Sequence, residues 1–147
     1  RESGGLDALS SAADVLDQGR ALGIFPEGTR SKRTEAPFLL PGKTGVARLS
    51  ASYPECVVVP IALIGTRNMM EAQKHKFPRL HKQVTIQSGE GITWYQWLTD
   101  VNGGNQSAES LKLLAEKEEH EIRSELAAFY RRFTDQLMGS ILALGAP

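Results

Sequence analysis

The stretch Ala21–Ser31, ALGIFPEGTRS, joins a wholly apolar run to a charged turn. The run of residues 21–25 does not alternate, which predicts a β-strand covered on both faces. Pro26 has no N–H to donate to a β-ladder and marks the predicted end of this strand. Open α/β sheets bind ligands just past the carboxyl ends of their strands. We therefore expect the functional site in the turn that begins at Pro26.

Further helices and strands are predicted on both sides of this stretch. Apolar residues at helical spacing predict a helix before it, with Ser3 as a candidate N-cap and Gly19 where the helix stops. After it, residues 27–42 predict a long loop, residues 43–52 a short helix, and residues 57–64 and 83–87 two further strands. This order predicts an α/β fold in which the strands form the buried layer.

The carboxyl-terminal third predicts helical structure. Residues 100–107 are polar and contain two adjacent glycines, so they predict a linker or turn. Apolar positions from Ile122 to Leu144 recur at spacings of three and four, which predicts a long amphipathic helix that packs on the domain by default or lies in a bilayer interface. We divide the chain into a domain of residues 1–103 and an amphipathic helical tail of residues 104–147. The aromatic cluster at 92–98 is either core packing or an interfacial anchor.

The composition excludes several classes of protein. Lys and Arg number 17 against 17 Asp and Glu, and a net charge of zero argues against a generally basic nucleic-acid binder. The single cysteine, Cys56, cannot form an internal disulfide. His75 and His81 lack an accompanying cluster of Cys or carboxylates, so no metal site is expected. The longest apolar run, residues 56–64, falls short of the roughly 20 residues that span a bilayer.

The residue types of the turn suit a phosphate. Gly28 lets backbone N–H groups approach a ligand closely, and Arg30 offers a planar fork of donors. Thr29 and Ser31 add hydroxyl donors, whereas Glu27 would repel a phosphate and more naturally accepts from substrate hydroxyls or orients an arginine. Together they indicate a site for a small phosphorylated polyol. The simpler reading is a surface turn with an exposed ion pair.

Two short blocks carry a family resemblance. Residues 25–31 (FPEGTRS) resemble the third signature block of the glycerophospholipid acyltransferases, which include the 1-acyl-glycerol-3-phosphate acyltransferases. Residues 59–62 (VPIA) with Gly65-Thr66 resemble the fourth block, and Arg1 stands where the second block would end. The resemblance covers about residues 1–92. It implies an α/β fold with a mixed, largely parallel sheet flanked by helices, of which residues 1–103 are the carboxyl-terminal portion.

The resemblance also implies roles for particular residues. The acceptor's phosphate and glycerol would be bound by Glu27, Gly28, Thr29, Arg30 and Ser31, with Arg1 as a second phosphate ligand. Pro60 would shape the strand that borders the acyl channel. Lys43 either adds a phosphate contact or is a solvated surface lysine. The sequence Gly42-Lys43-Thr44 copies the end of a nucleotide-binding P-loop, but Pro37 stands where that motif needs its first glycine.

One block of the family pattern is absent from these residues. The first block, a His followed five positions later by an Asp, supplies the catalytic dyad, whereas His75, His81 and His120 are followed there by Leu80, Ile86 and Glu125. We therefore expect an acyltransferase domain whose amino-terminal part, with the dyad, lies upstream of Arg1. The chain by itself is expected to be inactive, and no metal or prosthetic group is expected.

The resemblance predicts an enzyme of phospholipid biosynthesis at the cytoplasmic membrane face, peripheral or anchored. It would move a fatty acyl group from acyl-CoA or acyl-carrier protein to 1-acyl-sn-glycerol-3-phosphate. The alternative is a non-catalytic lipid-headgroup-binding or regulatory module that keeps the phosphate pocket. Residues 67–82 carry five Lys and Arg against one Glu, which is either a solvated loop or a segment attracted to anionic headgroups.

Overall fold

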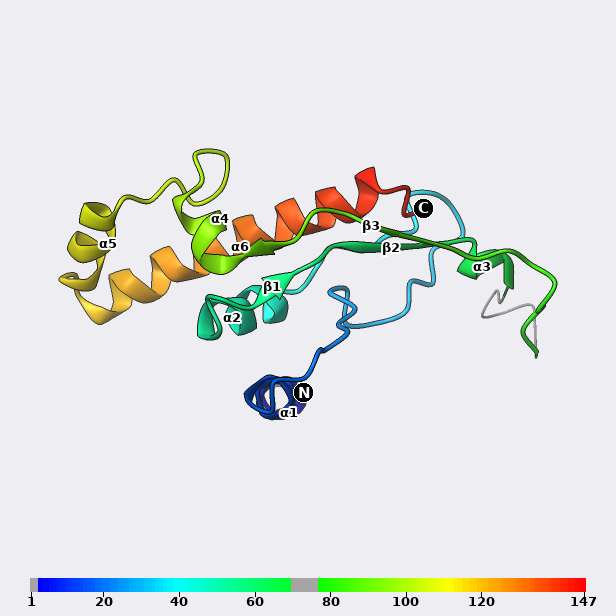
Figure 1. Cartoon of the computed structure of the whole chain (residues 1–147), viewed down its shortest axis with the longest axis horizontal. Helices are drawn as coiled ribbons and strands as arrows, with labels where there is room; N and C mark the ends of the chain where they lie inside the picture. The colour runs from blue at the N-terminus through cyan, green and yellow to red at the C-terminus, as the bar shows by residue number, and fades with distance from the viewer. Residues whose placement is uncertain (1–2, 70–76) are drawn as a thin grey trace.

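The computed structural model describes residues 3–69 and 77–147. In chain order the elements are α1 (Ser3–Asp17), α2 (Gly45–Ser52), β1 (Val57–Val58), β2 (Ile61–Ile64), α3 (Thr66–Met69), β3 (Thr85–Ser88), β4 (Ile92–Thr93), α4 (Trp94–Thr99), α5 (Ala108–Ala115) and α6 (Glu119–Ala143). The long carboxyl-terminal helix α6 runs along one side of a narrow β-ribbon, and the shorter helix α2 packs against α6 (Figure 1).

The ribbon consists of two antiparallel strand pairs in series. β1 pairs with β4 and β2 with β3, and the second register sets Ile61 opposite Ser88. The predicted strand 57–64 is thus split at Pro60, which has no N–H for a ladder. Its carbonyl still accepts from the N–H of Gly89 at 2.9 Å, so the backbone remains paired across the break. The largely parallel sheet implied by the family resemblance stays a prediction.

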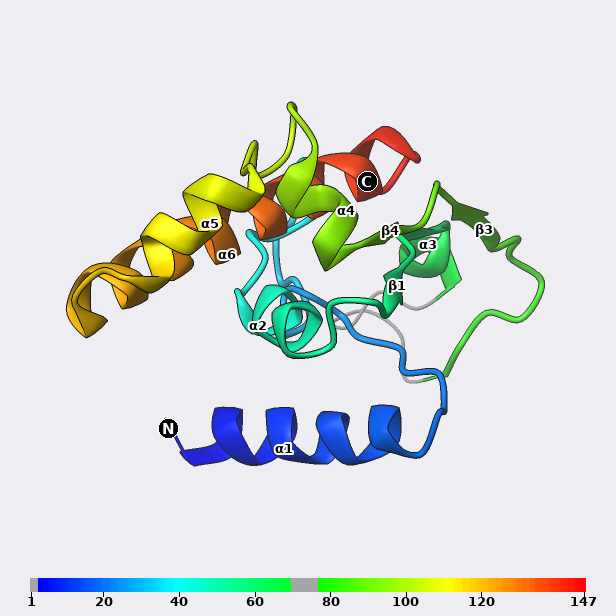
Figure 2. The same cartoon turned by 60° about the vertical axis from the view of Figure 1, so that its left-hand side comes forward.

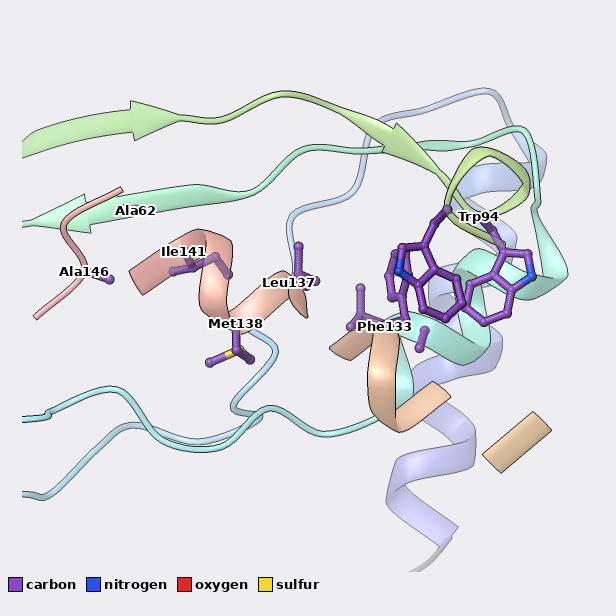
Figure 3. Packing of buried hydrophobic residues seen from close by; sticks show 10 residues of the cluster. Ala62, Trp94, Phe133, Leu137, Met138, Ile141 and Ala146 are labelled. Carbon is purple, nitrogen blue, oxygen red and sulfur yellow. The ribbon is translucent and has the colours of Figure 1, made fainter. Parts of the chain in front are cut away.

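The core lies where α6 meets α2, α4 and the ribbon. Phe133 of α6 is only 2% exposed and contacts the rings of Trp94 and Trp97, at centroid distances of 5.2 and 5.1 Å. The buried stripe continues along α6 through Leu137 and Ile141 toward Ala62 of β2 (Figure 3). The predicted amphipathic helix is therefore confirmed and packs on the rest of the chain. The 103/104 domain boundary stays a prediction.

Helix α1 packs on the outer side of α2, away from α6 (Figure 2). It confirms the helix predicted before residue 19, and Gly19 follows it with a left-handed φ of 68°. The hydroxyl of Tyr53, which follows α2, donates to the Asp17 carboxylate at 2.7 Å. That carboxylate raises the pKa of Tyr53, since ionising the phenol would break the hydrogen bond and place two negative charges together.

The prediction of a covered strand at residues 21–25 is wrong. These residues form no β-ladder, and Leu22, Ile24 and Phe25 are 36%, 42% and 73% exposed. The described strands pair only with one another, so this run has no backbone partner among the described residues. An apolar pattern indicates a preference for burial, but a strand also needs a neighbour for its N–H and C=O groups.

Within residues 3–69 and 77–147, no helix combines the length and the apolar character needed to cross a membrane.

Replacing Phe133 by alanine should destabilise the fold by about 3–5 kcal/mol, because the cavity would lie among the two indoles and α6. Urea unfolding followed by tryptophan fluorescence measures this loss. Tyr95→Ala removes an aromatic ring that is 58% exposed on the adjoining helix, so its expected cost is small. Equal costs for the two variants would contradict the described core.

Candidate functional site

The block 25–31 folds as a tight turn. The N–H of Gly28 donates to the carbonyl of Phe25 at 3.0 Å, which places Pro26 and Glu27 in the turn's two central positions. Proline is favoured at the first of these positions because its φ is already close to the required value. Gly28 itself has a φ of 65°, a left-handed conformation that suits glycine. The predicted turn after Pro26 is therefore confirmed.

Lys43 lies against this turn although 15 residues separate it from Gly28. Its backbone N–H donates to the carbonyl of Pro26 at 2.8 Å. Its side chain crosses Gly28 so closely that a Cβ on Gly28 would meet Lys43 Cδ and Nζ at 3.0 Å. The exposed ammonium group thus stands beside the turn, and glycine at position 28 leaves it room.

Glu27 links the start of the long loop, residues 27–42, to its end. Its Oε2 accepts a hydrogen bond from the N–H of Leu40 at 2.7 Å, in a partly buried setting. The sequence interpretation gave this carboxylate to substrate hydroxyls or to an arginine, and the structure shows it joining the two ends of the loop. A charged hydrogen bond of this kind is typically worth about 1.5–3 kcal/mol.

The remaining block residues face outward. Thr29 and Arg30 are exposed, and the described residues offer the Arg30 guanidinium no hydrogen bond or ion pair. Ser31 is half-buried, and its hydroxyl accepts from the N–H of Arg33 at 3.4 Å. Pro60 is buried in the ribbon, and Arg1 lies outside the described residues. Phosphate binding by Arg30 and Arg1, and the channel role of Pro60, stay predictions.

Two arginines bind the backbone of the loop, Arg33 from inside it and Arg67 from the basic segment 67–82, and the sequence analysis assigned neither of them this role. Arg33 Nη1 donates to the carbonyls of Pro37 and Leu39, at 2.8 and 3.2 Å. Arg67 Nη2 donates to the carbonyl of Arg33 at 2.7 Å, and its guanidinium lies 4.0 Å from the centroid of the Phe38 ring. The Arg67 contacts span more than 25 residues, so no local pattern could have indicated them.

The end of the loop is fastened to the carboxyl-terminal region. Arg131 Nη1 of α6 donates to the carbonyl of Gly42 at 2.9 Å, and the N–H of Leu39 donates to the carbonyl of Pro147 at 3.0 Å. Gly42 is buried against α6, where a Cβ would meet Thr134 Cγ2 at 2.7 Å. The position of Lys43 beside the turn therefore depends on α6.

Two hollows occur near these elements in the described part of the chain. One, of about 310 Å³, is formed by loop residues 33–37, and the other, of about 420 Å³, lies between α1 and α2. Residues 25–31 line neither of these two hollows. The same described residues contain no cluster of three His, Cys, Asp or Glu that could hold a metal ion.

The turn and its supporting lysine lie inside a stretch that matches a known family model. Residues 1–64 match the Acyltransferase family. This match supports a general acyltransferase function, and it contains the block 25–31, Lys43 and Pro60. No curated protein and no solved structure matches the chain.

Glu27→Ala should open the loop of residues 27–42, whereas Glu27→Gln retains an oxygen that can accept from the Leu40 amide. Hydrogen exchange of the Leu40 amide measures the difference. Exchange should accelerate in the alanine variant by about tenfold or more, given the worth of a charged hydrogen bond. It should change less in the glutamine variant. Unchanged protection in Glu27→Ala would show that the carboxylate does not close the loop.

Gly28→Ala should cost about 1–2 kcal/mol of unfolding free energy through its left-handed φ, plus a further loss from crowding by Lys43. Two glycines provide controls. Gly19 has a φ of 68° but nothing within 4 Å of an added Cβ, and Gly23 has the same free space without a positive φ. Gly19→Ala should thus show the backbone cost alone, and Gly23→Ala should be close to neutral.

The crowding contribution is isolated by Lys43→Ala. Combined with Gly28→Ala in a double-mutant cycle, it should make the second substitution cheaper, because the lysine stem no longer meets the new methyl group. A coupling free energy of zero in urea unfolding would contradict the contact between Lys43 and Gly28.

Proposed function

We propose that the turn 25–31 binds the phosphate and glycerol of a glycerophospholipid acceptor in an acyl-transfer reaction. The observation that carries the proposal is the position of this turn within the acyltransferase match, with the exposed Arg30 in the turn and the exposed Lys43 beside Gly28. The acceptor that fits best is 1-acyl-sn-glycerol-3-phosphate, whose product is phosphatidic acid.

The electrostatics of the turn favour an anion. Arg30 supplies a planar fork for phosphate oxygens, and Lys43 Nζ adds a second positive charge beside Gly28. The Glu27 carboxylate opposes a phosphate, and the two positive charges of Arg30 and Lys43 outweigh its single negative charge. The missing side chain at Gly28 leaves room for the Lys43 side chain, which brings Nζ against the turn.

The reaction requires a general base, and none of the three histidines in residues 1–147 is followed five positions later by an Asp. In the proposed chemistry the acceptor hydroxyl oxygen attacks the thioester carbonyl, and a new C–O ester bond forms as the C–S bond breaks. The hydroxyl proton passes through a histidine to the departing thiol of coenzyme A or acyl-carrier protein. The dyad would come from residues outside 1–147, and these residues would supply acceptor binding. We place the reaction at the cytoplasmic membrane face, where its lipid substrates reside.

Arg30→Ala should weaken binding of hexanoyl-lysophosphatidate about tenfold or more, since a charged phosphate contact is lost. Isothermal titration calorimetry of the chain below the lipid's micelle concentration measures this. Arg30→Lys should recover part of the affinity. Lys32→Ala removes a neighbouring exposed charge outside the block and should change the dissociation constant by less than about threefold, as befits a screened surface charge.

Monohexanoylglycerol, which lacks the phosphate, should bind far more weakly than the phosphate monoester. Equal affinity for both lipids, or wild-type affinity of Arg30→Ala, would contradict the acceptor site. The chain of residues 1–147 alone should release no thiol from acyl-CoA in the presence of acceptor. Thiol release by this chain would contradict the role given to the dyad, and binding without transfer in protein that also contains a His–Asp pair would favour the headgroup-binding module.

A further inference from the structure

The end of the molecule beyond the ribbon carries two strongly exposed apolar side chains. Phe77 is 81% exposed and Leu80 is 83% exposed, the two highest values among the large hydrophobic residues described. They belong to residues 77–82 (FPRLHK), which we call the tip segment. It lies at the opposite end of the long axis from α5 (Figure 1).

Basic side chains are interleaved with these apolar ones. The tip segment contains Arg79, His81 and Lys82, and no Asp or Glu occurs anywhere in residues 72–89. The chain as a whole is neutral, so this local excess of positive charge is balanced elsewhere in the sequence. A segment that is both apolar and cationic, without intervening carboxylates, suits a surface that is both apolar and anionic.

The backbone of the tip segment is held in place. The N–H of Arg79 donates to the carbonyl of Met69 at the end of α3 at 2.8 Å, and the N–H of Lys82 donates to the carbonyl of Arg79 at 3.0 Å. The second bond closes a turn in which Leu80 occupies the first central position. Leu80 is thus presented outward by a hydrogen-bonded turn.

We propose that the tip segment docks on an anionic lipid bilayer, with Phe77 and Leu80 entering the interface and the adjacent cations meeting lipid phosphates. Two side chains expose a few hundred Å² at most, well below the roughly 800 Å² per partner of a stable protein interface. A bilayer requires no complementary groove, and each inserted apolar group and each cation near the lipid phosphates adds its own favourable free energy of binding. The surface is distinct from the turn 25–31, so the proposal does not depend on acceptor binding there.

Vesicle co-sedimentation of the chain tests this docking. The chain should bind phosphatidylcholine vesicles containing phosphatidylserine, and binding should fall when phosphatidylserine is omitted or salt is raised. Leu80→Ala and Phe77→Ala should each lower the partition coefficient by about tenfold, in line with the transfer of a large apolar side chain. Lys82→Glu should lower it by a similar factor through loss and reversal of charge.

Matched substitutions on α5 provide the controls. Leu113→Ala removes a 58% exposed leucine, and Lys112→Glu reverses an exposed lysine, both at the far end of the molecule. Neither should change vesicle binding by more than about twofold, since additional surface charge far from the membrane is screened. Losses as large as those of the tip variants would show that vesicle binding is not localised at the tip.

A tryptophan probe reports the depth of insertion directly. Emission from Phe77→Trp should be quenched by brominated lipids, whereas Leu113→Trp should show only the background of the native tryptophans. Absence of quenching at position 77, or binding that is unaffected by the tip substitutions, would overturn the proposal. Concentration-dependent self-association that Leu80→Ala abolishes, seen by sedimentation without lipid, would overturn it in favour of a second copy of this chain.

Discussion

The carboxylate of Glu27 and the backbone of Lys43 together hold the two ends of the long loop side by side. Glu27 Oε2 accepts from the N–H of Leu40, and the N–H of Lys43 donates to the carbonyl of Pro26. Without these bonds the two ends of the loop could separate, because closing a flexible loop costs conformational entropy. With them, Gly28, Arg30 and Lys43 occupy one small region of the surface.

This closure relies in turn on the carboxyl-terminal helix. Arg131 fastens the carbonyl of Gly42, and the buried face of Gly42 fits against Thr134 of α6. Phe133, which lies between these two α6 residues in the sequence, packs against Trp94 and Trp97 and fixes the helix to α4. Figure 3 shows Phe133 beside Trp94. The predicted tail, residues 104–147, therefore carries residues that support the candidate site.

The helices and the turn were predicted correctly because their conformation depends mainly on residues close together in the sequence. Helical spacing indicated α1, the short helix α2 and the apolar stripe of α6, and the structure confirms each helix. The sequence of the turn indicated its bend because proline fixes φ near the value that the turn needs and glycine tolerates the positive φ that follows. The fold class and the phosphate ligands are not settled by local patterns and stay proposals.

Failures arose where the outcome depended on distant residues. The apolar run 21–25 has the composition of a strand but no ladder partner among the described residues, and Pro60 divides what composition presented as one strand. The Leu40 amide that engages Glu27 lies 13 residues away, and Arg131 reaches Gly42 over 89 residues. Such contacts depend on the assembled tertiary structure, which periodicity does not describe.

The central claim is that the turn after Pro26 binds a phosphate monoester. Titration of the isotopically labelled chain with glycerol-3-phosphate, followed by amide and guanidinium NMR shifts, tests it most directly. The account predicts saturable shifts confined to the amides of residues 28–31 and the Arg30 Nε–H, with glycerol alone producing none. Saturable shifts that instead map to the hollow between α1 and α2, or none at the turn, would contradict it.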